Sequence, residues 1–180
     1  MAKQTATSGT SAGIRVLYSE DTFLVARECE KLLDSLLEPD QRSMALYEPK
    51  ADQAQAADVL DELRTLPFLA PKRVVLIKDA EPFVKANAPA LENYLDAPSP
   101  SGVLIMTVTA WDKRTRFHKK LQKAGGLVEI GKMKSRQLPA YAAGYAREAC
   151  GIRLDAQCSR LLVELVGDDP GRLCREVDKL

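Results

Sequence analysis

Residues 74–77 constrain the fold more than any other part of the sequence, because they form an uninterrupted apolar and largely β-branched run (VVLI). Such a run is typical of a strand that is buried on both faces, as in a parallel sheet covered by helices. Residues 103–108 (VLIMTV) form a second run of the same character. We therefore expect a layered α/β fold with these two strands near its centre.

The segment just before the first run carries four neighbouring apolar residues, Leu66, Pro67, Phe68 and Leu69. We call these four residues the apolar loop. Prolines at positions 67 and 71 disfavour helix at the residues that precede them, so a helix is expected to end here before the strand begins. The side chains of the apolar loop either pack under the domain or are held out for a partner. The pattern alone leaves both alternatives open.

Strands and helices are expected to alternate through residues 14–130. The strands are predicted over 14–18, 43–47, 74–77, 103–108 and 127–130. The helices are predicted after Asp21 as N-cap and before Pro39, after Asp52 with Gln55 as its capping-box partner, over 89–95, and from Asp112 to 124. The second of these helices has an apolar face of Ala56, Val59, Leu60, Leu63 and Leu66. This order predicts a parallel sheet with right-handed crossovers.

Beyond residue 134 the pattern changes to three consecutive helices, predicted over 138–150, 155–166 and 169–180. The expected organisation is an α/β domain over 14–134 and a small all-helical domain over 135–180. Residues 1–13 are rich in Ser, Thr, Ala and Gly and are expected to be a disordered lead-in. The last amphipathic pattern runs to Leu180 without a polar tail, which predicts that the chain stops within a longer protein.

Charge and cysteine content exclude several classes of protein. The formal net charge is +1, so no global field draws the whole chain to nucleic acid. No apolar run is long enough for a membrane span, and the first residues lack the apolar core of a signal peptide. The four cysteines form no CxxC motif, which favours free thiols over a metal site or disulfide. These features predict a cytoplasmic protein without a metal ion, a cofactor or a membrane partner.

The turn after the first strand is where an α/β nucleotide-binding protein would carry its phosphate loop. That loop needs glycines, a lysine and a Ser or Thr. The sequence here is Ser19, Glu20, Asp21 and Thr22, with two carboxylates and neither glycine nor lysine. We therefore predict a degenerate nucleotide site that does not bind ATP. Asp79 and Glu81, which follow the strand at 74–77, resemble a Walker B acidic pair but are expected to serve a structural role without a phosphate loop.

The segment over residues 112–124 is predicted to be a strongly basic helix. Its cations are Lys113, Arg114, Arg116, Lys119, Lys120 and Lys123. These side chains form either a solvated face or a contact for DNA phosphates or an acidic partner. His118, the only histidine, lies among them and is interpreted as a surface residue, because no nucleophile can be paired with it from the sequence.

The order of motifs resembles the delta subunit of the bacterial DNA polymerase III clamp loader. The matching segments are 17–24 (LYSEDTFL), 63–69 (LRTLPFL), 73–80 (RVVLIKDA), 112–114 (DKR), 138–141 (LPAY), 161–169 (LLVELVGDD) and 176–180 (EVDKL). They extend over nearly the whole chain from residue 14. The resemblance implies an AAA+-like module of the P-loop NTPase type that has lost its nucleotide site, followed by a helical lid domain.

The resemblance also implies a function. Delta subunits are non-catalytic parts of a DNA-directed DNA polymerase complex, a nucleotidyltransferase, and act in DNA replication. They bind the ring-shaped sliding clamp (the beta subunit) and hold one interface open for loading on primed DNA, so that DNA is an indirect partner. In the family, two adjacent apolar side chains make the clamp contact, and they match Pro67 and Phe68, with Leu66 and Leu69 beside them. Pro67 replaces an aliphatic residue of some members.

Family members carry a third, C-terminal collar domain that joins them to the other clamp loader subunits, and it is absent from this chain. Two alternatives to the clamp-binding function are kept. One is a P-loop-like ATPase or transferase domain with an unrecognised nucleotide site. The other is a structural domain in which Phe68 belongs to the core.

Overall fold

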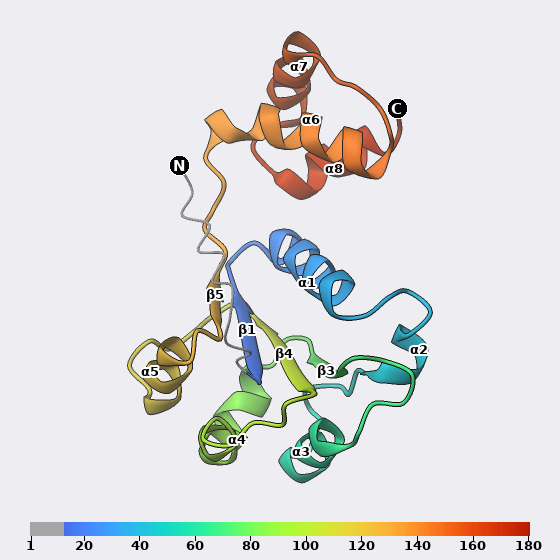
Figure 1. The fold of residues 1–180 in the computed structure, drawn as a ribbon. Coiled ribbons are helices and arrows are strands. Elements are labelled where there is room, and N and C mark those ends of the chain that lie inside the picture. The colour runs from blue at the N-terminus through green and yellow to red at the C-terminus, as the bar shows by residue number, and fades with distance from the viewer. Residues whose placement is uncertain (1–12) are drawn as a thin grey trace. The chain divides into compact units, whose positions relative to one another are not determined.

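The computed structural model describes residues 13–180, which divide between Ile130 and Gly131 into two compact units (Figure 1). The expected lead-in over residues 1–13 lies outside the described residues except for Gly13. Across the described chain, no helix combines the length and the apolar character needed to cross a lipid bilayer. The two units are described separately below.

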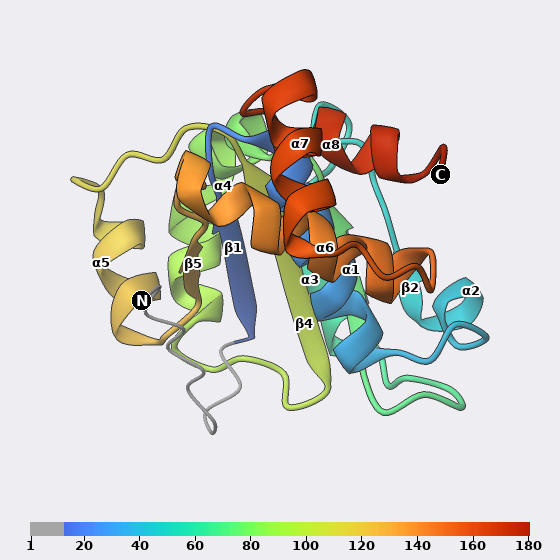
Figure 2. The ribbon, with the colours of Figure 1, turned by 90° about the horizontal axis from the view of Figure 1, so that it is seen from above.

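The first unit is built on a five-stranded parallel sheet with the order β2-β3-β4-β1-β5. The strands are β1 (Ile14–Tyr18), β2 (Leu46–Tyr47), β3 (Arg73–Ile77), β4 (Gly102–Val108) and β5 (Leu127–Glu129). The helices are α1 (Thr22–Leu36), α2 (Arg42–Ala45), α3 (Ala56–Arg64), α4 (Glu81–Tyr94) and α5 (Arg116–Lys123). The predicted parallel α/β sheet is thus confirmed. Helices α2 and α5 lie at opposite edges of this sheet in both views (Figure 1 and Figure 2).

Both faces of the sheet are covered, which explains the uninterrupted apolar run in β3. Val75 and Ile77 belong to the core on the face covered by α3, α4 and α5. Val74 and Leu76 belong to the core on the opposite face, with α1 and Ala45 at the end of α2. Because successive side chains of a strand point to opposite faces, a strand between two helical layers needs apolar residues at every position.

Several predicted boundaries were wrong for identifiable local reasons. Residues 43–45 were expected in a strand but lie in α2, so that only two residues pair with β3. Asp52 does not cap α3, because residues 50–54 form a turn closed by the carbonyl of Lys50. The N-cap of α3 is Gln55, without a side-chain hydrogen bond.

Helix α4 is longer than predicted and α5 is shorter. Pro82 occupies the first turn of α4, where proline is compatible with helix, and the helix continues through Pro89. Helix α5 starts at Arg116 rather than at Asp112, because the Thr115 hydroxyl accepts a hydrogen bond from the backbone N–H of His118 and caps the helix there.

The second unit contains a short 3-10 turn (Ser135–Gln137) followed by α6 (Leu138–Ala149), α7 (Ala156–Val166) and α8 (Pro170–Val177). Leu138, Ala142 and Ala146 of α6 are buried, as are Leu173 and Val177 of α8. The Asp155 and Asp169 side chains cap α7 and α8 by accepting hydrogen bonds from backbone N–H groups.

Candidate functional site

The apolar loop lies between the end of α3 and the start of β3, and most of its side chains face solvent. Leu66 is 83% exposed, Phe68 is 75% exposed and Leu69 is 68% exposed, whereas Pro67 is half-buried. The alternative that places Phe68 in the core therefore does not hold. Large apolar side chains clustered on a surface loop are typical of protein interaction sites, where a few buried anchors supply most of the binding energy.

The end of α3 and the start of β3 are tied to the body of the unit. The backbone N–H of Thr65 donates to the carbonyls of Asp61 and Glu62, and this closes α3 before the apolar loop. Arg73, the first residue of β3, forms an ion pair with Glu62 and donates a second hydrogen bond to the carbonyl of Met44. The backbone at both ends of the apolar loop is therefore fixed while its side chains are exposed.

Within the apolar loop, Leu69 has a φ of +58°, in the left-handed region that leucine rarely adopts. Its carbonyl accepts a hydrogen bond of 3.3 Å from Nε2 of Gln41. Unfavourable backbone conformations persist where surrounding contacts hold them, and they occur often at binding sites. Leu66 was expected on the apolar face of the preceding helix, but it lies beyond the end of α3 and does not pack with that face.

The turn between β1 and α1 uses its own side chains where a phosphate would be held. The N–H of Asp21 donates to the Ser19 hydroxyl at 3.1 Å, and the N–H of Leu24 donates to the Asp21 carboxylate at 3.1 Å. Glu20 is exposed and adds a second negative charge, while Thr22 begins the helix. A phosphate at this helix start would meet an occupied amide and two carboxylates, which oppose anion binding.

Lys78 and Asp79, at the end of β3, line a cavity of about 180 Å³ between α1 and the ends of β3 and β4 and a more open hollow of about 560 Å³ beside β2. The ammonium of Lys78 is paired with Glu48 at 3.1 Å. The thiol of Cys29 also lines the cavity, and its burial raises its pKa to about 11, so it is a neutral group there. Nothing in this arrangement supplies an unpaired cation for a phosphate chain among the lining residues described here.

Glu81 serves the loop that follows β4. Its Oε1 accepts hydrogen bonds from the N–H of Thr109 at 2.6 Å, the hydroxyl of Thr109 at 2.9 Å and the N–H of Ala110 at 3.3 Å. Desolvation acts to raise the pKa of Glu81, but these donors lower it, and the balance leaves the pKa below its ordinary value. The residue that resembles the second carboxylate of a Walker B pair thus holds a neighbouring loop.

We expect Glu81→Gln to lower the free energy of unfolding by about 1–2 kcal/mol at neutral pH, because a neutral amide oxygen accepts weaker hydrogen bonds than a carboxylate. A depressed pKa in the folded state adds stability above the pKa of the unfolded state, and this stability is lost as the pH falls through the folded-state pKa. The difference between wild type and variant should therefore shrink at about pH 3. Urea unfolding at both pH values tests this, with Glu164→Gln on the exposed side of α7 as control. An equal difference at both pH values would contradict the assignment.

The basic residues over 112–124 are only partly free. Four of them lie near carboxylates: Lys113 is 3.1 Å from Glu129, Arg114 is 3.1 Å from Asp112, Arg116 is 3.9 Å from Glu92 and Lys120 is 2.6 Å from Asp96. Lys113 also lies over the Tyr18 ring, 5.4 Å from its centroid. Lys119 and Lys123 are exposed, and neither has a carboxylate within 4.0 Å among residues 13–180.

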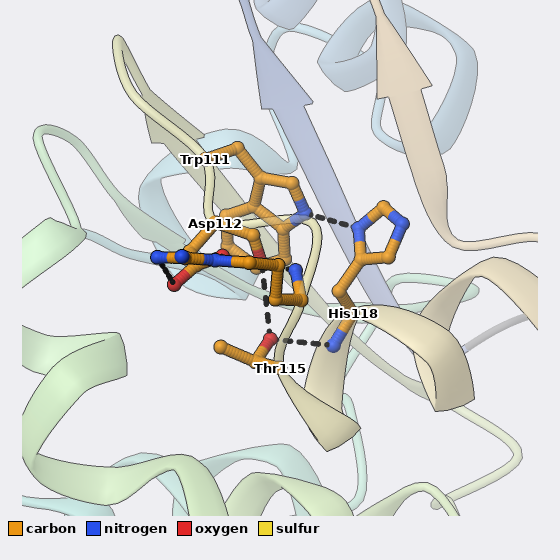
Figure 3. Close-up of polar contacts among 5 residues, drawn as sticks. Trp111, Asp112, Thr115 and His118 are labelled. Atoms are coloured by element: carbon orange, nitrogen blue, oxygen red, sulfur yellow. Dashed lines mark hydrogen bonds and ion pairs between the residues drawn. The ribbon is translucent and has the colours of Figure 1, made fainter.

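The interpretation of His118 as a surface residue was wrong, because the side chain is only 6% exposed. Its Nδ1 accepts a hydrogen bond of 2.6 Å from the indole N–H of Trp111, while its backbone N–H donates to Thr115 (Figure 3). The Trp111 ring also meets Phe117 edge to face at 5.8 Å. His118 therefore fixes the turn before α5. The nearby Trp111 is the sequence signal that could have indicated this, since a partly buried indole N–H requires an acceptor.

Comparison with known proteins gives a consistent result. The model of the family described as DNA polymerase III, delta subunit, matches residues 16–131. DNA polymerase III subunit delta of Bacillus subtilis (strain 168) is 19% identical over 174 residues, which cover 91% of this chain and 50% of that protein. The solved structure of the Bacillus subtilis DNA clamp loader delta protein matches with a TM-score of 0.73 and 19% identity, over 93% of this chain and 52% of that one. The chain thus spans about half the length of these relatives.

Two further solved structures share the fold at lower similarity. Domain III of the Thermotoga maritima replication initiation protein DnaA matches with a TM-score of 0.53 and 11% identity, over 94% of this chain and 75% of that one. The Thermotoga maritima RuvB Holliday junction branch migration motor matches with a TM-score of 0.51 and 12% identity, over 91% of this chain and 53% of that one. These neighbours are AAA+ proteins, so the predicted AAA+-like fold is confirmed.

Proposed function

The chain belongs to the DNA polymerase III delta subunit family, and from this premise we propose that it binds the ring-shaped sliding clamp and holds one ring interface open for loading on primed DNA. The observation that carries the proposal is the exposure of Leu66, Phe68 and Leu69 on a loop whose ends are fixed. Phe68 is the proposed anchor, and it would enter an apolar pocket on the clamp. Pro67, which is half-buried, would set the direction of the chain beside it.

Ring opening follows from differential binding. A ligand shifts a conformational equilibrium only by the difference between its affinities for the two states. The chain would therefore favour an open ring if the apolar loop and the end of α3 fit the clamp better when one interface is separated. No bond is made or broken in this mechanism, and no nucleotide is required. We accordingly propose that the chain is a non-catalytic subunit.

The proposed partners differ in how directly they act. The clamp is the direct partner, and DNA is involved through the ring that is loaded on it. Lys119 and Lys123 on α5 are the cations we propose for any contact with DNA phosphates or an acidic partner, because no carboxylate of the described residues neutralises them. We propose that association with other clamp loader subunits depends on the C-terminal collar domain that characterises the family.

Two measurements with purified components test the proposal. The chain should retain the sliding clamp of the same organism when the chain is immobilised, and it should accelerate release of clamps from nicked circular DNA without ATP. Retention without faster release would limit the function to binding. Failure to retain the clamp would overturn the proposal.

Nucleotide titration tests the remaining alternative, an ATPase or transferase domain. We expect millimolar Mg-ATP to leave the melting temperature unchanged, because the start of α1 is capped by Asp21 and Lys78 is paired with Glu48. A ligand present at about 100 times its Kd would stabilise the folded state by about 2.7 kcal/mol, which is readily detected by thermal unfolding. A clear upward shift with Mg-ATP but not with Mg²⁺ alone would favour the enzyme alternative.

A further inference from the structure

Gln41 links the segment before α2 to the apolar loop, 28 residues further along the chain. Its Nε2 donates a hydrogen bond of 3.3 Å to the carbonyl of Leu69. Its Oε1 accepts a hydrogen bond of 3.1 Å from the N–H of Glu38. Both ends of the side-chain amide are thus engaged, so its orientation is set by its own segment and its donor is directed at the loop.

The segment that carries Gln41 is itself held on two sides. Arg42 pairs with Glu30 at 2.9 Å and with Asp34 at 2.6 Å, and these contacts fasten α2 to α1. On the other side, Arg73 donates a hydrogen bond to the carbonyl of Met44. Helix α2 and the loop after α3 are neighbours in both ribbon views (Figure 1 and Figure 2). Helix α2 therefore forms a fixed base beside the apolar loop.

The contact with Gln41 falls at the residue whose conformation most needs support. Leu69 is in the left-handed region, with a φ of +58°, and Phe68 directly precedes it. Among the hydrogen bonds of residues 13–180, the bond from Gln41 is the one that reaches the backbone of residues 66–69 from another part of the chain. Without it, the turn at Leu69 would exchange with ordinary conformations and Phe68 would change direction.

We propose that Gln41 is a positioning residue for the clamp contact, which it serves by holding the Leu69 carbonyl and hence the direction of Phe68. The inference rests on the proposed function of the apolar loop. Its physical basis is preorganisation, because a loop already in its bound conformation loses less conformational freedom on association. Gln41 would thus raise affinity through the direction of Phe68 rather than through a contact of its own with the clamp.

The decisive variant is Gln41→Glu, which keeps an acceptor for the N–H of Glu38 and replaces the donor to Leu69 by an oxygen. We expect clamp affinity to fall about three- to tenfold, with an unchanged melting temperature. Gln122→Glu on the exposed side of α5 is the matched control, because it adds the same charge at the opposite edge of the sheet. Amide hydrogen exchange at residues 68–70 should become faster in Gln41→Glu and not in the control.

A double-mutant cycle separates positioning from other effects. In a Phe68→Leu background, which keeps a weaker anchor, Gln41→Glu should cost clearly less affinity than in the wild type, because it acts through Phe68. An equal loss in both backgrounds, or an affinity equal to that of Gln122→Glu, would overturn the inference while leaving the proposed function intact. If the wild-type chain binds no clamp, the proposed function fails, and the exchange data alone then show whether Gln41 holds the loop. Unfolding of Gln41→Glu at a lower temperature would assign Gln41 a general structural role instead.

Discussion

Phe68→Ala should lower the affinity for the sliding clamp at least about thirtyfold, or by about 2 kcal/mol, while changing the free energy of unfolding by less than about 1 kcal/mol. The two effects separate because the side chain is 75% exposed in the free chain and would be buried only against the clamp. Its removal therefore leaves little cavity in the fold but removes the proposed anchor of the interface. Calorimetric titration with the clamp and urea unfolding of the free chain measure the two quantities.

Two alanine variants serve as controls for this result. Phe83→Ala removes a phenylalanine that is 1% exposed in the core and should lower the free energy of unfolding by about 3–5 kcal/mol. Leu165→Ala on α7 removes a side chain that is 77% exposed and should change neither stability nor clamp affinity. If Phe68→Ala destabilised the chain as much as Phe83→Ala, or if clamp affinity were unaffected, Phe68 would not be the anchor.

The exposure of Phe68 illustrates what the sequence could not determine. Residues 66–69 are apolar and locally resemble either a buried turn or an exposed anchor. The outcome depends on distant contacts, including the one from Gln41 that supports Leu69. By contrast, the strands at 74–77 and 103–108 were predictable because burial on both faces requires an apolar residue at nearly every position, a pattern written in the strand itself.

The missed elements have similarly local explanations. Helix α2 has four residues, too few to show a helical period, and its position depends on the pairs that Arg42 forms with α1. The start of α4 was missed because Pro82 was taken as a break, although proline fits the first turn of a helix. His118 was assigned to the surface from its basic neighbours, whereas its partner Trp111 lies before the helix. The turn at residues 19–22 was informative because the missing glycine and lysine can be seen without any tertiary contact.

Gly102→Ala is expected to lower the free energy of unfolding of the first unit by about 3 kcal/mol. Gly102 begins β4 and packs against the last turn of α3. A Cβ at this position would lie 2.2 Å from the carbonyl oxygen of Leu63, 3.0 Å from its carbonyl carbon and 3.1 Å from its Cα. All three atoms belong to the backbone, so no side chain can rotate away to make room. Either the strand or the end of α3 must move.

This displacement connects stability to the proposed site, because Leu63 lies two residues before Thr65, where α3 ends and the apolar loop follows. Gly102→Ala should therefore weaken clamp binding in the molecules that remain folded, unlike a core substitution remote from α3. Urea unfolding and clamp titration of the variant measure the two effects. Gly144→Ala in α6 is the control, because no atom lies within 4 Å of its added Cβ, and replacement of a helical glycine should stabilise the second unit by about 0.5–1 kcal/mol. A stable Gly102→Ala variant with unaltered affinity would mean that α3 can shift without moving Phe68, and the fixed base proposed for the apolar loop would then lie in α2 alone.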